Sequence, residues 1–300
     1  MQAGDRQVLD ELAVCADVAA LVRDRDGRHV IGDVEAPVPV FSVTKMFLAV
    51  ATLRLAESGH LGLDAQVRRW LPQIAGAITV REILGHTAGL PDYPATADYL
   101  AAVADRPGEP WGLTEILDAS LTGDWPPRGA FSYANVGYWL LGAVIERTTG
   151  VPLAGTLAAE VFRPAEMAAT FYPEIGAGVT GDGYDTRWAG PAGAAWSTAS
   201  DVDRFLAALL GGALLHAGSL AAMTSAKPAG AHPPWREPGY GLGVMVDGSL
   251  GTFGHGGGGP GYQAAAFIAP GAGRSAVILA RSSSCALASP TELALRWLVI

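Results

Sequence analysis

The residues with the clearest chemical potential in this 300-residue sequence are Ser42 and Lys45, three positions apart at the start of an apolar segment. Residues at this spacing share one face of a helix, so the serine hydroxyl and the lysine amine can approach each other. We expect Ser42 in the first turn of that helix, where free N–H groups favour negative charge. The pattern also fits a capped helix with a solvated lysine. However, residues 46–50 are all apolar, so we interpret Ser42 as a nucleophile and Lys45 as its activator.

A second pair of polar residues, Tyr133 and Asn135, stands just before another apolar segment. On a tight turn, a tyrosine two positions ahead of an asparagine can direct both side chains into one cavity. An opposite charge favours the ionised form of a group, so an ammonium beside Tyr133 would favour its phenolate. The phenolate would be a general base, which typically contributes about 10²–10⁴-fold to a rate. Both residues are also common in ordinary turns.

A third patch is the glycine-rich segment that contains His255, Gly256, Gly257 and Gly258. Glycines let a strand edge lie against a ligand with its N–H groups exposed. The N–H groups of Ser42 and Gly258 could then form an oxyanion hole, where losing one donor typically costs about 2.7–4 kcal/mol. The alternative is a flexible hairpin turn. A phosphate loop is disfavoured, because no Lys-Ser/Thr pair follows.

An alternative hypothesis makes His86 the general base of a Ser-His-Asp triad. The sequence contains no G-x-S-x-G nucleophile elbow to pair with it, and capping and turn residues surround it, which favours a structural role. No two histidines stand at metal-ligand spacing with acids nearby. We therefore expect no metal and no other cofactor.

Composition limits the class of partner. Hydrophobic residues make up 50% of the chain and charged residues 16%, which is enough for a sizeable core. A net charge of −9 argues against nucleic acid or an anionic membrane as the main partner. We expect a small ester or amide substrate, no nucleic acid and no membrane, and we leave the oligomeric state open. The two cysteines, Cys15 and Cys285, are expected to be small buried side chains.

The start of the sequence is polar and charged, without the apolar run of a signal peptide. We expect a cytoplasmic protein, although a chain whose leader had been removed would look the same. Short apolar runs and turn signals predict strands near both ends of the chain, and helices between them. We expect an α/β (α+β) fold in which an antiparallel sheet is flanked by helices and an all-helical lobe is inserted. The chain would form a single domain over residues 1–300, with a sheet lobe at about 1–40 and 185–300 and a helical lobe at about 41–184.

Taken in order, Ser42-x-x-Lys45, Tyr133-x-Asn135 and His255-Gly256-Gly257 resemble the three active-site motifs of the class C β-lactamase-like serine hydrolases. That broad family includes β-lactamases, DD-peptidases, esterases, D-aminopeptidases and acyltransferases. Residues 78–91, 131–150, 197–201 and 240–243 resemble other segments of the family. The similarity spans about residues 37–285.

The resemblance implies a β-lactamase/transpeptidase-like fold with the site between sheet and helical lobe. Ser42 would be acylated, with its proton shared between Lys45 and Tyr133. Asn135 would orient the substrate amide or ester, and the N–H groups of Ser42 and Gly258 would hold the oxyanion. Which of Lys45 and Tyr133 is the formal base stays open. Walls of the acyl pocket would come from some of the tryptophans, namely Trp111, Trp125, Trp139, Trp188, Trp196 and Trp235.

Two departures affect the expected substrate. His255 stands where β-lactamases of this family carry lysine, and Gly256 replaces the usual hydroxyl residue. Both changes weaken the capture of a β-lactam carboxylate. We therefore expect a serine hydrolase or acyltransferase that acts on a small ester or amide through an acyl-Ser42 intermediate. The alternatives are an exported DD-peptidase or β-lactamase and a non-catalytic ligand-binding homologue.

Overall fold

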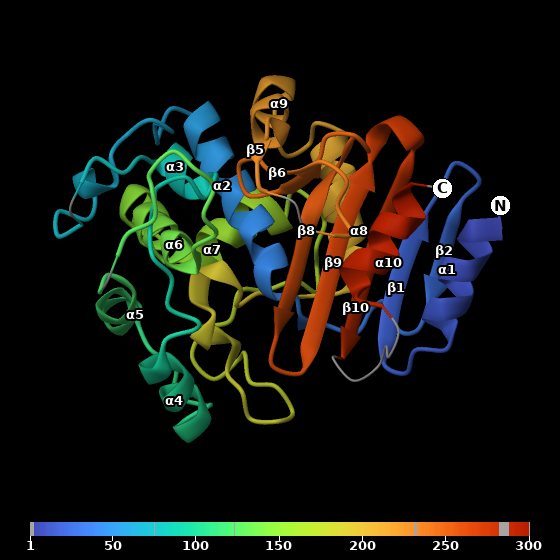
Figure 1. Ribbon diagram of the computed structural model, residues 1–300, viewed down its shortest axis with the longest axis horizontal. Coiled ribbons are helices and arrows are strands. Elements are labelled where there is room, and N and C mark those ends of the chain that lie inside the picture. Colours follow the sequence, from blue (N-terminus) through green and yellow to red (C-terminus); the bar gives the residue numbers. More distant parts are fainter. Residues whose placement is uncertain (1–2, 75, 123, 231–232, 282–287, 300) are drawn as a thin grey trace.

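The computed structural model describes residues 3–74, 76–122, 124–230, 233–281 and 288–299. Within them, one antiparallel sheet has the strand order β2-β1-β10-β9-β8-β7-β6-β5 and so joins strands from both ends of the chain (Figure 1). Its strands are β1 (Val18–Arg23), β2 (Arg28–Ile31), β5 (Lys227–Pro228), β6 (Pro238–Tyr240), β7 (Met245–Asp247), β8 (Thr252–Gly259), β9 (Tyr262–Ala269) and β10 (Arg274–Arg281). A separate short pair joins β3 (Val38–Pro39) to β4 (Trp196–Ser197).

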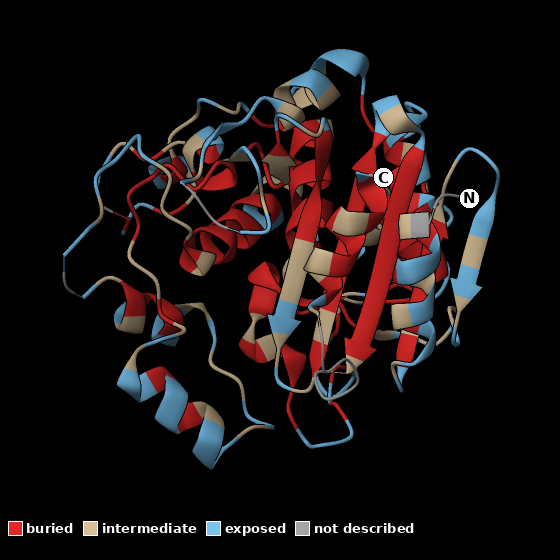
Figure 2. Cartoon of the chain, turned by 45° about the vertical axis from the view of Figure 1, so that its right-hand side comes forward, coloured by how far each residue is buried: buried red, intermediate tan, exposed pale blue. Residues whose placement is uncertain are grey.

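Both faces of the sheet are covered. Side chains along a strand alternate between the faces, so one strand contributes to both cores. In β10, Ala276 and Ile278 pack with α1 (Ala3–Ala13) and α10 (Pro290–Leu298), while Val277 and Leu279 belong to the larger core on the opposite face. Figure 2 shows the result, with buried central strands and an exposed edge at β2. The expected α/β (α+β) class, an antiparallel sheet flanked by helices, is confirmed.

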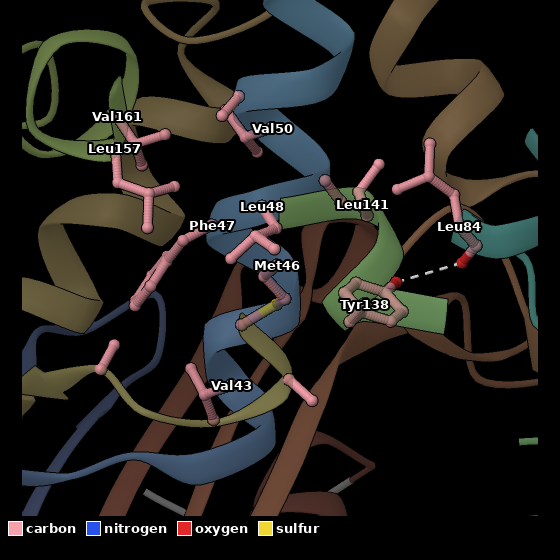
Figure 3. Close-up of a cluster of buried hydrophobic side chains, with 14 of the residues drawn as sticks. Val43, Met46, Phe47, Leu48, Val50, Leu84, Tyr138, Leu141, Leu157 and Val161 are labelled. Carbon is pink, nitrogen blue, oxygen red and sulfur yellow. Dashed lines mark hydrogen bonds between the residues drawn. The ribbon is translucent and has the colours of Figure 1, made fainter. Parts of the chain in front are cut away.

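Helix α2 (Thr44–Glu57) runs through the larger core and carries the first motif. Its side chains are buried around most of its circumference, as Figure 3 shows for Met46, Phe47, Leu48 and Val50. A helix that is apolar all round must be buried on all sides, and here the neighbours are the sheet on one side and helices on the other. Lys45 therefore lies on a helix that is buried along most of its length, and Ser42 lies in the turn directly before it.

The remaining helices lie between the two groups of strands in the sequence or against the sheet. They are α3 (Val80–Leu84), α4 (Ala97–Asp105), α5 (Leu113–Ser120), α6 (Asn135–Thr149), α7 (Leu153–Leu157), α8 (Ala199–Leu210) and α9 (Ala217–Thr224). The predicted capping box over Thr79 and Glu82 is present at the start of α3. No helix in the described parts of the chain has both the length and the apolar character needed to cross a membrane. The residue limits of the two lobes stay a prediction.

Two local expectations need correction. Ser42 lies in the 3₁₀ turn η1 (Phe41–Val43) before α2, not in the first α-helical turn. There the N–H of Val43 donates to Val40 three residues back, which tightens the chain relative to an α-helix. Cys15 is half-buried and disulfide-bonded, so it differs from the small buried side chain expected. Cys285 lies outside the described residues.

Candidate active site

Ser42 and Lys45 meet as the spacing predicted. The 3₁₀ turn places the Ser42 hydroxyl at the edge of a cavity, and the first turn of α2 places Lys45 directly behind it. Lys45 Nζ lies 3.0 Å from Ser42 Oγ. Phe41 adopts a left-handed φ of 43°, a conformation that costs a bulky residue energy. This strain lies immediately before the proposed nucleophile.

Lys45 is completely buried, with a relative exposure of 0%. Besides Ser42, its amine donates to Asn135 Oδ1 at 2.8 Å and to the carbonyl oxygen of Ala192 at 2.8 Å. Burial lowers the pKa of Lys45 to about 7, and the negative charge of Asp92 opposes that shift. A lysine with this pKa exchanges its proton near neutral pH, as a general base must.

Tyr133 comes from the turn that leads into α6, and its hydroxyl donates to Ser42 Oγ at 3.2 Å. Its ring packs on that of His86, with the ring centres 4.2 Å apart. Burial raises the pKa of Tyr133, and the charge of Asp92 raises it further. The sequence favoured a phenolate. The structure corrects that expectation, because desolvation disfavours the charged form of a buried tyrosine.

His86 holds this turn in place and makes no contact with Ser42 in the described hydrogen bonds. Its Nδ1 accepts from the backbone N–H of Ala134 at 3.1 Å, and its carbonyl oxygen accepts from the N–H of Ser132 at 2.8 Å. Burial lowers the pKa of His86 well below its usual value, so the imidazole is neutral. This geometry agrees with the structural role that the sequence favoured.

The glycine segment forms the end of β8, which continues past its neighbour β7. Strand β7 pairs with β8 only as far as Gly254, so the following residues present a free edge on that side. A Cβ added to Gly257 would lie 2.3 Å from the carbonyl oxygen of Val40 and 3.1 Å from the Ser42 nitrogen. Only glycine therefore lets the strand approach the Ser42 turn so closely. Gly258 lines the cavity beside Ser42.

His255 and Gly256 are placed differently from the sequence prediction of a substrate contact. His255 is fully buried, and its Nε2 lies 2.9 Å from the hydroxyl of Tyr240. Burial lowers the pKa of His255 to about 3, so it carries no charge at neutral pH. A Cβ at Gly256 would face Thr291 of α10, on the other side of the sheet. Neither residue, nor Gly257, is among the described residues that line the cavity.

The cavity in front of Ser42 has a volume of about 520 Å³. Tyr133 and Asn135 form part of its polar floor, and none of its described lining residues carries a charged side chain. Apolar and aromatic groups make up its walls, notably Phe41, Tyr93, Tyr99, Leu100, Val103 and Tyr184. The site thus suits an uncharged, largely apolar group.

Sequence reasoning chose the wrong aromatic residues for these walls. None of the six tryptophans it proposed lines the described cavity. Trp111 and Trp188 pack behind Tyr99, with ring centres 5.8 and 5.5 Å away. Asp92 was also missed, although its Oδ2 accepts a hydrogen bond of 2.8 Å from Asn135 Nδ2. Its position directly after Gly89-Leu90-Pro91 was a weak signal, because a residue after a turn has no fixed direction until the chain folds.

An antiparallel sheet with a helical layer, and a Ser-Lys-Tyr cluster at its edge, define the class of penicillin-recognising and related serine enzymes. The sequence model of the family described as Beta-lactamase matches residues 15–291. The chain therefore belongs to this family, as its three motifs predicted.

Curated relatives match this chain in part. Penicillin-binding protein 4* of Bacillus subtilis (strain 168) is 32% identical over 136 residues, which is 43% of this chain and 29% of the relative. Esterase EstB of Burkholderia gladioli is 36% identical over 143 residues, which is 42% of this chain and 36% of the relative. The matched region thus spans about a third of the length of these two proteins.

Solved structures match over almost the whole chain. A D-stereospecific amidohydrolase from Streptomyces sp. has a TM-score of 0.81 at 27% identity, covering 94% of each chain. The D-amino acid amidase of Ochrobactrum anthropi SV3, in complex with D-phenylalanine, has a TM-score of 0.80 at 22% identity, covering 99% of each chain. The second likeness concerns the fold alone.

Proposed function

We propose that this protein is a serine hydrolase, or an acyltransferase, that acts on small uncharged esters or amides through an acyl-Ser42 intermediate. The observation that carries the proposal is the position of Ser42 Oγ, 3.0 Å from Lys45 Nζ and 3.2 Å from the Tyr133 hydroxyl, at the edge of an apolar cavity. A proton acceptor, Lys45, and a proton donor, Tyr133, thus flank one nucleophilic oxygen atom.

The partners of Lys45 decide where its lone pair points. A neutral amine has two N–H bonds and one lone pair. Asn135 Oδ1 and the carbonyl oxygen of Ala192 can only accept, so each takes one N–H. The lone pair is then left for Ser42. This arrangement, together with a pKa of about 7, makes Lys45 the base in our proposal and leaves Tyr133 as a protonated phenol.

Acylation then proceeds in two balanced steps. As Ser42 Oγ bonds to the substrate carbonyl carbon, its proton moves to Lys45 and the carbonyl oxygen becomes an oxyanion. The N–H groups of Ser42 and Gly258 stabilise that charge. The bond from the carbonyl carbon to the leaving oxygen or nitrogen then breaks, and the leaving group takes a proton from the Tyr133 hydroxyl. Lys45 then gives the proton that it accepted back to Tyr133. Asn135 has a second N–H on Nδ2, and this group orients the substrate carbonyl.

Water attacks the acyl carbon in a hydrolase, and another nucleophile does so in an acyltransferase; Lys45 accepts the proton of the attacking group. The bond from the acyl carbon to Ser42 Oγ then breaks, and Ser42 Oγ takes its proton back from Lys45. Both outcomes use the same residues. The esterase among the relatives supports ester substrates, and the D-stereospecific amidohydrolase supports amides.

A β-lactamase or DD-peptidase activity receives less support from the site. Such substrates carry a carboxylate, and no charged side chain lines the described cavity. His255 adds none, because it is buried and neutral. We therefore propose clear turnover of esters and little of penicillins or cephalosporins.

Intact-mass measurement after incubation with a substrate panel tests the proposal. The panel contains p-nitrophenyl esters of different chain length, D- and L-amino acid amides, a penicillin, a cephalosporin and a fluorophosphonate. We expect one acyl or phosphonyl adduct per chain, lost in Ser42→Ala, and faster turnover of esters or amides than of β-lactams. An adduct that persists in Ser42→Ala would contradict the proposal, and cephalosporin turnover equal to that of the esters would contradict the substrate class.

A further inference from the structure

Asp92 lies behind the proposed catalytic groups and has no part in the mechanism described so far. It follows the turn after α3, and its side chain reaches the start of α6. There Oδ2 accepts from Asn135 Nδ2 at 2.8 Å, and Oδ1 accepts from the backbone N–H of Val136 at 3.2 Å. We propose that Asp92 is a positioning residue, which fixes the direction of the Asn135 amide and so directs the Lys45 lone pair at Ser42. This inference rests on the proposed function.

The direction of the Asn135 amide follows from the chemistry of its two neighbours. Burial raises the pKa of Asp92, and the hydrogen bonds that it accepts from Asn135 and Val136 oppose that shift. In its ionised form the carboxylate only accepts hydrogen bonds, so the NH₂ group of Asn135 faces Asp92. Its oxygen then faces Lys45, at 2.8 Å. The opposite orientation would bring two oxygens together at Asp92 and would present an N–H group to Lys45.

That opposite orientation would change the proton path. With its oxygen toward Lys45, Asn135 takes one of the two N–H bonds of the neutral amine. With its NH₂ toward Lys45, it would instead donate to the lone pair, in competition with the Ser42 hydroxyl. The carboxylate of Asp92, which in the described hydrogen bonds contacts Asn135 and not Lys45, thus determines whether the Lys45 lone pair accepts the Ser42 proton.

Asp92 also stabilises the start of α6, because its carboxylate accepts from a free N–H of the first helical turn. A purely structural role would consist of such backbone contacts, which Asp92 makes with Tyr93, Asn135 and Val136. Asp92→Asn separates the two roles. The amide oxygen of the new side chain can still accept from Val136, whereas its NH₂ would face the NH₂ of Asn135. Keeping the contact with Val136 therefore requires Asn135 to reverse, so that the helix start is kept and the direction at Lys45 is lost.

The charge of Asp92 adds a second readout. The other titratable groups that face Lys45 are Tyr133 and Tyr138, whose rings lie 4.9 and 5.3 Å from Nζ, and the imidazoles of His86 and His255. Burial favours the uncharged form of all four. Asp92 is the acid that raises the pKa of Lys45 against burial. Its removal should therefore move the acidic limb of the rate profile to lower pH.

The experiment measures the rate of Ser42 labelling by a fluorophosphonate between pH 5 and pH 10, in the wild type and in Asp92→Asn. The wild type should gain rate as pH rises through about 7, where Lys45 loses its proton. In Asp92→Asn we expect the plateau to fall by about 10²-fold, the effect of a misplaced reacting group. We expect the acidic limb to move down by about one pH unit.

The swap Asp92→Asn with Asn135→Asp provides the rescue. The new asparagine donates to the new aspartate and accepts from Val136, while the aspartate accepts from Lys45. This variant restores the hydrogen bonds that join Lys45, residue 135, residue 92 and Val136, together with the single negative charge, but it lacks the second N–H of Asn135 that faces the substrate. Its reference is therefore Asn135→Asp alone, which lacks the same N–H. In Asn135→Asp two carboxylates face each other, whereas the swap restores a donor and an acceptor, so we expect the plateau of the swap to be at least about 10-fold higher than that of Asn135→Asp. Its acidic limb should lie at or above that of the wild type, because the negative charge now touches Lys45.

Asp247→Asn is the control for the loss of a buried acid. Asp247 is fully buried and accepts from the N–H of Arg236, away from the cavity. We expect a lower melting temperature and an unchanged acidic limb. If the wild type is labelled at Ser42, an identical profile in Asp92→Asn, or a swap no faster than Asn135→Asp, would overturn the role of Asp92 alone. A wild type that is not labelled at Ser42 would overturn the proposed function together with it.

Discussion

On the floor of the cavity, polar groups hold one another in fixed positions, whereas on its outer wall a short helix presents loosely held apolar groups. Directly behind this floor, Lys45 is fully buried, with hydrogen bonds to three different segments of the chain. On the wall, Leu100 of α4 lines the same cavity and is 54% exposed, and Figure 2 shows the exposed outer surface of this helix. We therefore expect the proposed chemistry to depend on many coupled contacts and the substrate range to depend on few.

The largest effect should follow from removing Ser42, the proposed nucleophile on the floor. Ser42→Ala should lower turnover on the order of 10⁶-fold, as when the nucleophile of another serine hydrolase is removed. It should also abolish fluorophosphonate labelling. Ser132→Ala, next to Tyr133, is the control and should keep its label. Labelling at Ser132 or Ser197 in the wild type would show that the floor has been assigned wrongly.

Coupling across the floor should appear in Lys45→Ala and Tyr133→Phe. Each should lower the acylation rate by about 10²–10⁴-fold, the range for a positioned proton-transfer group. Since both groups serve the same proton path, the double variant should be little slower than the slower single variant. Pre-steady-state acylation measures this cycle, and a thermal melt separates damage to chemistry from damage to folding.

The two losses would multiply if Lys45 and Tyr133 acted independently. In that case Tyr133 would only protonate the leaving group, and Lys45 and Tyr133 would have separate roles in proton transfer.

The glycine edge of β8 offers a pair of neighbouring substitutions with opposite outcomes. At Gly257 an added Cβ would lie 2.3 Å from the carbonyl oxygen of Val40, whereas at Gly258 it meets no described atom within 4 Å. Gly257→Ala should therefore destabilise the protein by about 1–3 kcal/mol and lower acylation by about 10²-fold, because the Ser42 turn must shift.

Gly258→Ala keeps the backbone N–H and should leave both quantities near the wild-type values. Thermal melts and acylation rates of the two variants decide the comparison. Equal damage in both would mean that the tract is needed for flexibility and not for the close approach of Gly257.

The smallest effect should come from the outer wall. Leu100→Ala should lower kcat/KM for long-chain esters by about 10-fold, the value of a few methylenes in an apolar pocket, and should leave acetyl esters almost unchanged. Stability should change little, because the side chain is half exposed. Leu210→Ala on α8 removes a similarly exposed leucine away from the cavity and is the matched control. The ratio of long-chain to acetyl ester turnover measures the effect, and a fall equal for both chain lengths would place Leu100 outside the acyl-binding wall.

The sequence by itself determined the elements and the chemical class. Strands at both ends and helices between them could be predicted, because alternation and helical periodicity are local properties. Ser42 and Lys45 could be paired for the same reason, since they are one helical turn apart. Tyr133 and Asn135 were placed near them by motif order, and the structure brings both to Ser42 and Lys45.

Tertiary structure alone decided the protonation and the orientation of the side chains at the site. Burial lowers the pKa of Lys45 and raises that of Tyr133, which reverses the phenolate predicted from residue types. His255 turns to Tyr240, away from the cavity. Tyr99 and Tyr184 replace the expected tryptophans as aromatic walls. Asp92 becomes important only because the fold brings it to Asn135, 43 positions away in the sequence. Desolvation and contacts between distant residues come into existence only when the chain is packed, so no local pattern could have revealed them.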